Sequence, residues 1–225
     1  MKEKSSYRIL LPFLALILFV ALPVNANAWD RNKGTSLRVS QISRDTVFSF
    51  DKQRSGTIPV GWTNVSGNWI VDQDDKGNFL AQIAENGGMS FNVAVFDEDI
   101  LKDVELSIDI RAKRGEEDQG GGLIWRYMDS NNYYIVRFNP LEDNFRLYKV
   151  LNGQRIQLSS ASGTVPKGSW FNIEVVMKGS EVTCYLNGKK LIHKTDDTFV
   201  KPGKIGFWTK ADAVSDFDNF NIKGD

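Results

Sequence analysis

The feature that most constrains this chain is an alternation of apolar and polar residues that recurs from Thr46 to its end. Within residues 104–111, for example, Leu106, Ile108 and Ile110 alternate with charged or hydroxyl side chains. Successive side chains of a strand point to opposite faces, so this period of two indicates sheets with one face in a core and one in water. No long segment carries a convincing helical period. The sequence therefore predicts an all-β protein.

The alternating segments are short, evenly spaced and separated by residues that favour tight turns. Asn152-Gly153 and Asn187-Gly188 are dipeptides typical of two-residue hairpin loops. Even spacing of short strands predicts an antiparallel two-sheet β-sandwich. We expect strands at 47–50, 69–71, 79–83, 91–96, 104–111, 123–128, 133–138, 145–150, 156–158, 171–177, 181–186, 190–193, 204–208 and 217–222.

The N-terminus has the pattern of a secretory signal peptide. Lys2, Lys4 and Arg8 precede a nearly unbroken apolar run over residues 9–20, and Ala26-Asn27-Ala28 supplies small residues for cleavage. The apolar run is short for a membrane span. Residues 1–28 are therefore predicted to be a signal peptide, and the protein to be exported to the periplasm or the extracellular space.

The remainder divides into a short leader and one domain. Residues 29–45 are polar and aperiodic and are predicted to be an N-terminal leader, whereas residues 46–225 form the sandwich. Cys184 is the only cysteine, so the domain has no internal disulfide and depends on its core. Because Cys184 alternates with Val182 and Leu186, we interpret it as a small buried hydrophobe.

Charge excludes two classes of partner. Removal of residues 1–28 leaves 25 basic and 27 acidic residues, a net charge of −2. Nucleic acids and anionic membranes are bound through a basic footprint, which this chain lacks. The mature chain also contains no second apolar run long enough to span a bilayer. The oligomeric state is not predicted.

Several segments resemble the family of secreted bacterial proteins named for 3-keto-disaccharide hydrolase. The resemblance covers residues 46–223 and rests on the order and spacing of its pieces. It implies a concanavalin-A-like jelly roll of the lectin/glucanase superfamily and an action on saccharides. The matching segments are 47–51, 67–71, 120–126, 132–137, 167–171, 187–191, 203–212 and 217–220.

The sequence does not decide between catalysis and binding. Glucanases of family sixteen place acids alternately on one strand, as Glu-x-Asp-x-x-Glu or Glu-x-Asp-x-Glu, so that two carboxylates flank one glycosidic bond. The nearest segment here, 105–109, has only two acids, four residues apart. No catalytic residue is assigned. Three functions stay open: hydrolysis of 3-keto disaccharides or glycosides, non-catalytic carbohydrate binding, and a structural role in the envelope without a small ligand.

Alternation places many hydrogen-bonding and aromatic side chains on one outward sheet face. Aromatic rings accept the C–H face of a sugar, and charged or amide groups form paired hydrogen bonds with its hydroxyls. An ordinary solvated face with cross-strand pairs is the alternative. The predicted saccharide-binding residues are Asp109, Arg111, Arg126, Tyr133, Arg137, Asn139, Arg146, Tyr148, Trp208 and Lys210.

Metal binding is restricted to oxygen ligands. One histidine and one cysteine cannot form an ordinary zinc site. Asp51 follows the first strand, and Asp216 and Asp218 belong to the last, so these carboxylates would converge if the terminal strands pair. Such ligands suit Ca²⁺, so calcium is the one candidate cofactor. Surface turns with capping aspartates are the alternative.

The signal peptide generates the first prediction. Cleavage after Ala28 should give an exported protein whose N-terminal residue is Trp29, because the small residues before this bond fit the peptidase pattern. N-terminal sequencing of the exported protein tests it. A membrane-bound protein that retains Met1 would contradict it.

Overall fold

The computed structural model describes residues 44–225, and every regular element in this range is a β-strand. Within it there is no helix that could cross a membrane. The strands are β1 (Arg44–Phe48), β2 (Trp62–Ser66), β3 (Trp69–Asp74), β4 (Gly77–Gln82), β5 (Phe91–Leu101), β6 (Val104–Arg114), β7 (Gly121–Asp129), β8 (Asn132–Asn139), β9 (Asn144–Leu151), β10 (Gln154–Ser162), β11 (Trp170–Lys178), β12 (Glu181–Leu186), β13 (Lys189–Thr195), β14 (Gly203–Lys210) and β15 (Val214–Gly224).

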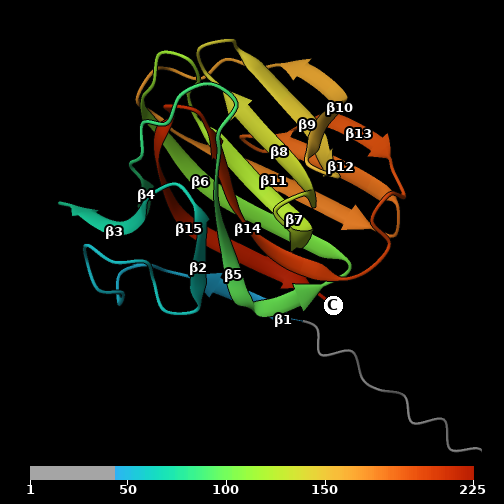
Figure 1. The fold of residues 1–225 in the computed structure, drawn as a ribbon, viewed down its shortest axis with the longest axis horizontal. Helices are drawn as coiled ribbons and strands as arrows, with labels where there is room; N and C mark the ends of the chain where they lie inside the picture. Colours follow the sequence, from blue (N-terminus) through green and yellow to red (C-terminus); the bar gives the residue numbers. More distant parts are fainter. Residues whose placement is uncertain (1–43) are drawn as a thin grey trace, which may run out of the picture. The chain divides into compact units, whose positions relative to one another are not determined.

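The strands form two antiparallel sheets that pack face to face (Figure 1). The eight-stranded sheet has the order β13-β12-β11-β6-β15-β4-β3, and β1 pairs with β15 beside it. The seven-stranded sheet has the order β10-β9-β8-β7-β14-β5-β2. About half of the neighbouring strands are not consecutive in sequence, and such crossovers between hairpins are the arrangement of a jelly-roll sandwich. The predicted fold class is confirmed.

The two sheets differ in how their outward faces are covered. In β6 and β11 of the eight-stranded sheet, buried residues alternate with partly exposed ones, as the period of two requires. In β7 and β8 of the seven-stranded sheet, almost every side chain is buried. Both faces of these two central strands are therefore covered, the inner one by the core and the outer one by neighbouring side chains of the same sheet.

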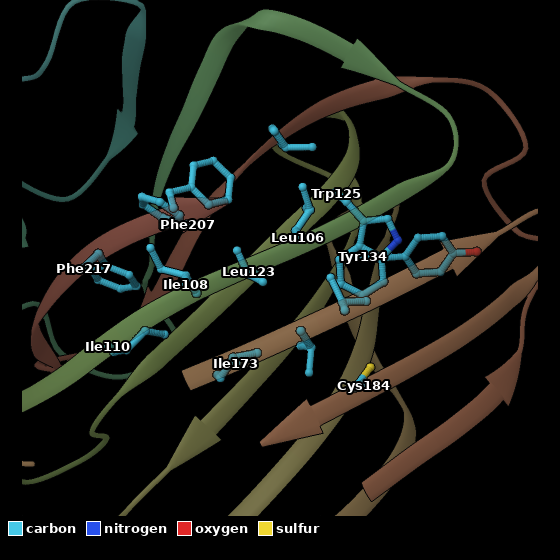
Figure 2. Close-up of a cluster of buried hydrophobic side chains, with 14 of the residues drawn as sticks. Leu106, Ile108, Ile110, Leu123, Trp125, Tyr134, Ile173, Cys184, Phe207 and Phe217 are labelled. Atoms are coloured by element: carbon cyan, nitrogen blue, oxygen red, sulfur yellow. The ribbon is translucent and has the colours of Figure 1, made fainter. Parts of the chain in front are cut away.

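The inner faces share one apolar core (Figure 2). Phe207 and Phe217 stack with their ring centroids 5.0 Å apart, and Trp125 and Tyr134 stack at 5.4 Å. Each large apolar side chain buried in this way stabilises the fold by about 1.5–3 kcal/mol. Cys184 lies in the same core, where burial raises the pKa of its thiol, and its predicted role as a small hydrophobe is confirmed.

The structure extends the predicted domain slightly at its start. β1 begins at Arg44, inside the segment 29–45 that was predicted to be a leader, and pairs with β15. The predicted signal peptide and the rest of the leader lie outside the described residues. Sequence analysis also missed β2, because Trp62–Ser66 has two apolar residues three apart and no period-two alternation.

Arg126 departs from the predicted alternation. The register between β7 and β8 shifts after Trp125, and Arg126 adopts a positive φ of 47°. This bulge re-aims the side chain, which is 1 % exposed. Its guanidinium donates hydrogen bonds to three backbone carbonyls and contacts one carboxylate. These partners are Lys102 O at 2.9 Å, Phe199 O at 2.5 Å, Gly179 O at 2.6 Å and Asp103 Oδ1 at 3.3 Å.

We therefore expect Arg126→Ala to destabilise the protein strongly. Loss of the guanidinium leaves buried carbonyls without donors, and breaking such a buried charged network costs about 3–5 kcal/mol. The free energy of unfolding in urea measures the effect. Lys190→Ala, which removes an exposed cation from β13, should change stability by no more than about 0.5 kcal/mol. A loss for Arg126→Ala no larger than for this control would contradict the assignment.

Candidate functional site

A second cluster of buried side chains covers the outward face of the seven-stranded sheet. It combines three tyrosines and one tryptophan with aliphatic residues from five adjacent strands, β5, β7, β8, β9 and β14. Phe91 packs against it from the start of β5, with its ring centroid 5.3 Å from that of Trp208. The members are Val93, Val95, Ile124, Tyr127, Tyr133, Ile135, Tyr148, Val150 and Trp208.

Three arginines on consecutive strands adjoin this second cluster. Arg137 lies on β8, Arg146 on β9 and Arg155 on β10. The register places Arg137 directly opposite Arg146, and Arg137 opposite Gly122, which is opposite Trp208. One cross-strand row thus carries two cations, a glycine and an indole.

Gly122 is needed in this row because the strands approach closely. A Cβ atom at this position would lie 1.8 Å from the Val136 carbonyl oxygen and 2.7 Å from the Arg137 Cα. Both contacts are with backbone, which cannot yield as a side chain does. Gly122, near the start of β7, therefore serves the close approach of two strand backbones.

Tyr148 connects the three arginines. The Arg155 guanidinium lies 4.7 Å from the centre of its ring and that of Arg137 lies 6.0 Å from it, distances of cation–π contact. Arg146 Nη1 is 3.5 Å from the Tyr148 hydroxyl. Arg155 also covers the rings of Phe91 and Trp208, at 5.5 Å and 5.6 Å.

Two carboxylates sit among the cations. A single oxygen of Glu142 lies 3.5 Å from Arg137 Nη2 and 3.5 Å from Arg146 Nη1. Asp118 lies 3.8 Å from Arg137 Nη1 and 3.6 Å from Lys210 Nζ. None of these four contacts is as short as the 2.7–2.9 Å of a well-formed charge-assisted hydrogen bond.

The two carboxylates have opposite pKa shifts. Burial raises the pKa of Asp118, although Arg137 and Lys210 counteract it. The pKa of Glu142 is lowered, chiefly by the hydrogen bond from the Asn144 amide and further by its two arginine neighbours. Glu142 is half exposed and is therefore the carboxylate that faces solvent.

The loop that carries Asp118 is held in place by the carboxylate of Asp212. The Asp212 carboxylate accepts hydrogen bonds from the backbone N–H groups of Glu116, Glu117 and Asp118. The Asn139 amide also donates to Asp118 Oδ1 at 3.0 Å. The loop between β6 and β7 thus carries a carboxylate to the sheet face in a fixed position.

Several donors in this region are buried without an acceptor. They are Arg137 Nε and Nη1, Arg146 Nε, Arg155 Nη1 and Trp208 Nε1. The Trp208 indole N–H lies beside the Tyr133 hydroxyl but forms no regular hydrogen bond with it. An unsatisfied buried donor costs about 1–3 kcal/mol and is rare in folded proteins, so several of them in one place mark a functional candidate.

We call this region the arginine–aromatic site. Seven of the ten residues predicted from sequence lie in it: Tyr133, Arg137, Asn139, Arg146, Tyr148, Trp208 and Lys210. The structure adds Phe91, Asp118, Glu142 and Arg155.

Three predicted residues lie elsewhere. Arg126 is engaged with backbone carbonyls at the β7 bulge, as described above. Asp109 and Arg111 belong to β6 in the eight-stranded sheet, and their placement beside the arginines was wrong. The alternation correctly predicted that both side chains point outward, but it could not predict which of the two sheets their strand belongs to. Arg111 stacks on Trp170 at 4.6 Å and bonds to Asp216 at 2.8 Å.

Asp109 lines a separate acidic hollow of about 420 Å³ on the eight-stranded sheet. Asp51 and Asp218 line it too, and the pKa of Asp218 is raised by burial and by the neighbouring carboxylates. Asp216 is instead paired with Arg111 and Lys113, so the calcium set predicted from sequence is not formed. Among residues 44–225, no three acidic, histidine or cysteine side chains are arranged to hold a metal ion.

The residues that sequence analysis missed had weak signals. Arg155 precedes the short segment predicted as a strand, whereas β10 actually begins at Gln154. Asp118 and Glu142 lie in loops, where alternation says nothing about direction. Phe91 was assigned to a strand, but the contact of its ring with Arg155 of the non-neighbouring strand β10 could not be read from the sequence.

Solved structures share this fold. The carbohydrate-binding module CBM66 from Bacillus subtilis is 21 % identical, with a TM-score of 0.63 over 73 % of this chain and 96 % of that module. A galectin-like protein of unknown function from Bacillus subtilis is 14 % identical, with a TM-score of 0.59 over 81 % and 98 %. At these identities the likeness establishes the fold.

A mutant of the GH43 protein BlXynB from Bacillus licheniformis also matches, at 15 % identity and a TM-score of 0.59. The match covers 80 % of this chain but only 39 % of that longer protein. No curated protein sequence is a significant match.

A family model gives the more specific relation. It describes 3-keto-alpha-glucoside-1,2-lyase-like domains and matches residues 49–223, nearly the whole of the sandwich and the arginine–aromatic site within it. This agrees with the family resemblance seen in the sequence segments. The chain belongs to the family of 3-keto-alpha-glucoside-1,2-lyase-like domains.

Proposed function

We propose that this protein binds a saccharide at the arginine–aromatic site. The observation that carries the proposal is the group of buried arginine and tryptophan donors that lack acceptors beside a layer of aromatic rings. Saccharide hydroxyls accept such hydrogen bonds, while the C–H face of a sugar ring packs on an aromatic ring. Family membership and the likeness to a carbohydrate-binding module support the same ligand class.

The ligand would meet the outer side chains of the site first. Arg146 is 31 % exposed and Glu142 is 50 % exposed, whereas Arg137 beneath them is 2 % exposed. Arg155 and Phe91 are also partly exposed and lie over Tyr148 and Trp208. Arg146, Glu142, Arg155 and Phe91 are therefore proposed to touch the saccharide, and Arg137 to position them.

We expect Arg146→Ala to weaken saccharide binding by about 1.5–3 kcal/mol, the worth of a hydrogen bond to a charged group. Its stability should change little, because the side chain is partly exposed and its contacts are long. Calorimetric titration of the purified protein against a panel of neutral, 3-keto and charged oligosaccharides measures the affinity. Thermal unfolding of each variant measures the stability.

Two comparisons make this test specific. Lys190→Ala removes a cation from the other sheet and should bind like the unaltered protein. Arg137→Ala should lower both affinity and stability, because it leaves the buried Asp118 with one cation fewer. Normal affinity in Arg146→Ala and Arg155→Ala would place the binding site elsewhere. Absence of binding to every saccharide would favour a structural role in the envelope.

A second candidate function is elimination from a 3-keto glycoside, supported by the family and by the raised pKa of Asp118. In such a reaction a base takes the proton from C2, which the C3 ketone acidifies. A double bond forms between C1 and C2, and the C1–O bond breaks, with its electrons and a proton going to the leaving alcohol. Asp118 is the candidate base, and Arg137 and Lys210 would stabilise the enolate oxygen. Elimination does not require the paired carboxylates of a glucanase.

If Asp118 is the base, the rate of elimination should rise with pH through a pKa above that of an ordinary aspartate. Burial raises the pKa of this carboxyl, and only the ionised form accepts a proton. The conjugated enone product absorbs ultraviolet light, which gives a continuous assay. Asp118→Asn should abolish turnover and keep saccharide affinity. Turnover unchanged in Asp118→Asn would remove this residue from the mechanism.

A further inference from the structure

We infer that the saccharide bound at the arginine–aromatic site carries an anionic group, a carboxylate or a sulfate, that lies between Arg146 and Arg155. The inference rests on the proposed function, because it specifies the chemistry of the ligand at the same site. Three observations support it: the excess positive charge of the site, the strand register that places two arginines opposite each other, and guanidinium N–H groups that lack acceptors.

Charge in the site is not balanced. Four cations, from three arginines and one lysine, interact with only two carboxylates, so the site has an excess of two positive charges. The whole predicted mature chain is slightly acidic, so this excess is local. The members are Arg137, Arg146, Arg155 and Lys210 against Asp118 and Glu142.

Register places like charges side by side. Arg137 and Arg146 are directly opposite each other on β8 and β9. Directly opposed like charges destabilise a sheet, and here one oxygen of Glu142 is shared between both guanidinium groups. Glu142 thus carries one negative charge for two adjacent cations, and Asp118, the other carboxylate near Arg137, is shared with Lys210. A further anion beside Arg146 would complete the pairing.

Arg155 is the least compensated cation. Among the described residues, no carboxylate lies within 4.0 Å of its guanidinium, which contacts three aromatic rings instead. Its Nη1 is buried without an acceptor, and burial lowers its pKa, so the charge is poorly solvated. An anion at this guanidinium would offset both the missing acceptor and the lost hydration.

Tyr148 brings the two outer arginines to one place. Arg155 lies over its ring and Arg146 Nη1 reaches its hydroxyl, so both guanidinium groups border the same side chain. Both are partly exposed, and each has an N–H without an acceptor. A planar guanidinium binds a carboxylate or sulfate through two parallel hydrogen bonds. The geometry therefore favours an anion bridging Arg146 and Arg155 beside a sugar ring.

Three matched probes test the inference in the purified protein. They are trigalacturonic acid, its carboxyl-reduced neutral counterpart, and a sulfated galactose trisaccharide of the same length. We expect at least one of the two anionic probes to bind at least tenfold more tightly than the neutral one, with an affinity that falls as salt rises. The preference between carboxylate and sulfate identifies the anion.

Variants then locate the anion. Arg155→Gln and Arg146→Gln should each reduce the preference for the anionic probe at least fivefold, with a much smaller effect on the neutral probe. Lys190→Gln makes the same change of charge on the other sheet and should leave the preference unchanged. Circular dichroism and thermal unfolding confirm that each variant is folded. A variant that fails to fold is replaced by Arg155→Lys, which keeps the charge but loses the planar pair of donors.

The outcomes separate the inference from the proposed function. Equal affinity for the neutral and anionic probes, or a preference that survives both Gln substitutions, overturns the inference. If another saccharide binds and depends on Arg146, the proposed function stands without it. If no saccharide binds at all, both are overturned.

Discussion

The structure depends on the burial of two inner sheet faces against each other. The chain has one cysteine, so no disulfide reinforces the sandwich, and the packed aromatic and aliphatic side chains must offset the entropy of ordering the strands. The same packing holds β7, β8 and β9 in place through their inner faces. The arginine–aromatic site is therefore built mainly on strands of this sheet, while Asp118 and Glu142 reach it from loops and Arg155 from the edge strand β10.

The alternation of the sequence predicted the two-sheet sandwich and seven residues of the candidate site. Tyr133 and Arg137 on one strand, and Arg146 and Tyr148 on the next, were placed outward because their neighbours Tyr134 and Leu147 are apolar core residues. The two strands are joined by a short turn and pair directly. Where two strands are consecutive in sequence and pair with each other, the alternation predicts which face a side chain lies on and which strand lies beside it.

The errors arose where pairing is not local or where the strand is irregular. Asp109 and Arg111 alternate correctly, but β6 pairs with β11 and β15 in the other sheet. Arg126 follows a register shift that no pattern in the sequence marks. Asp216 was expected to bind calcium, yet the structure gives it Arg111 as a partner, a contact between strands about one hundred residues apart. Each of these outcomes is determined by tertiary pairing and not by local sequence.

The pairing of the first and last strands has a mechanical consequence. β1 and β15 run antiparallel in register from Arg44 opposite Gly224 to Phe48 opposite Phe220, so the described domain starts and finishes at one point of one sheet (Figure 1). A force that pulls these two ends apart acts perpendicular to the strands. The hydrogen-bonded pairs between β1 and β15 then carry the load and break one after another. The domain should thus yield to small forces at this edge, while a load carried through β7 and β8 would meet the whole core.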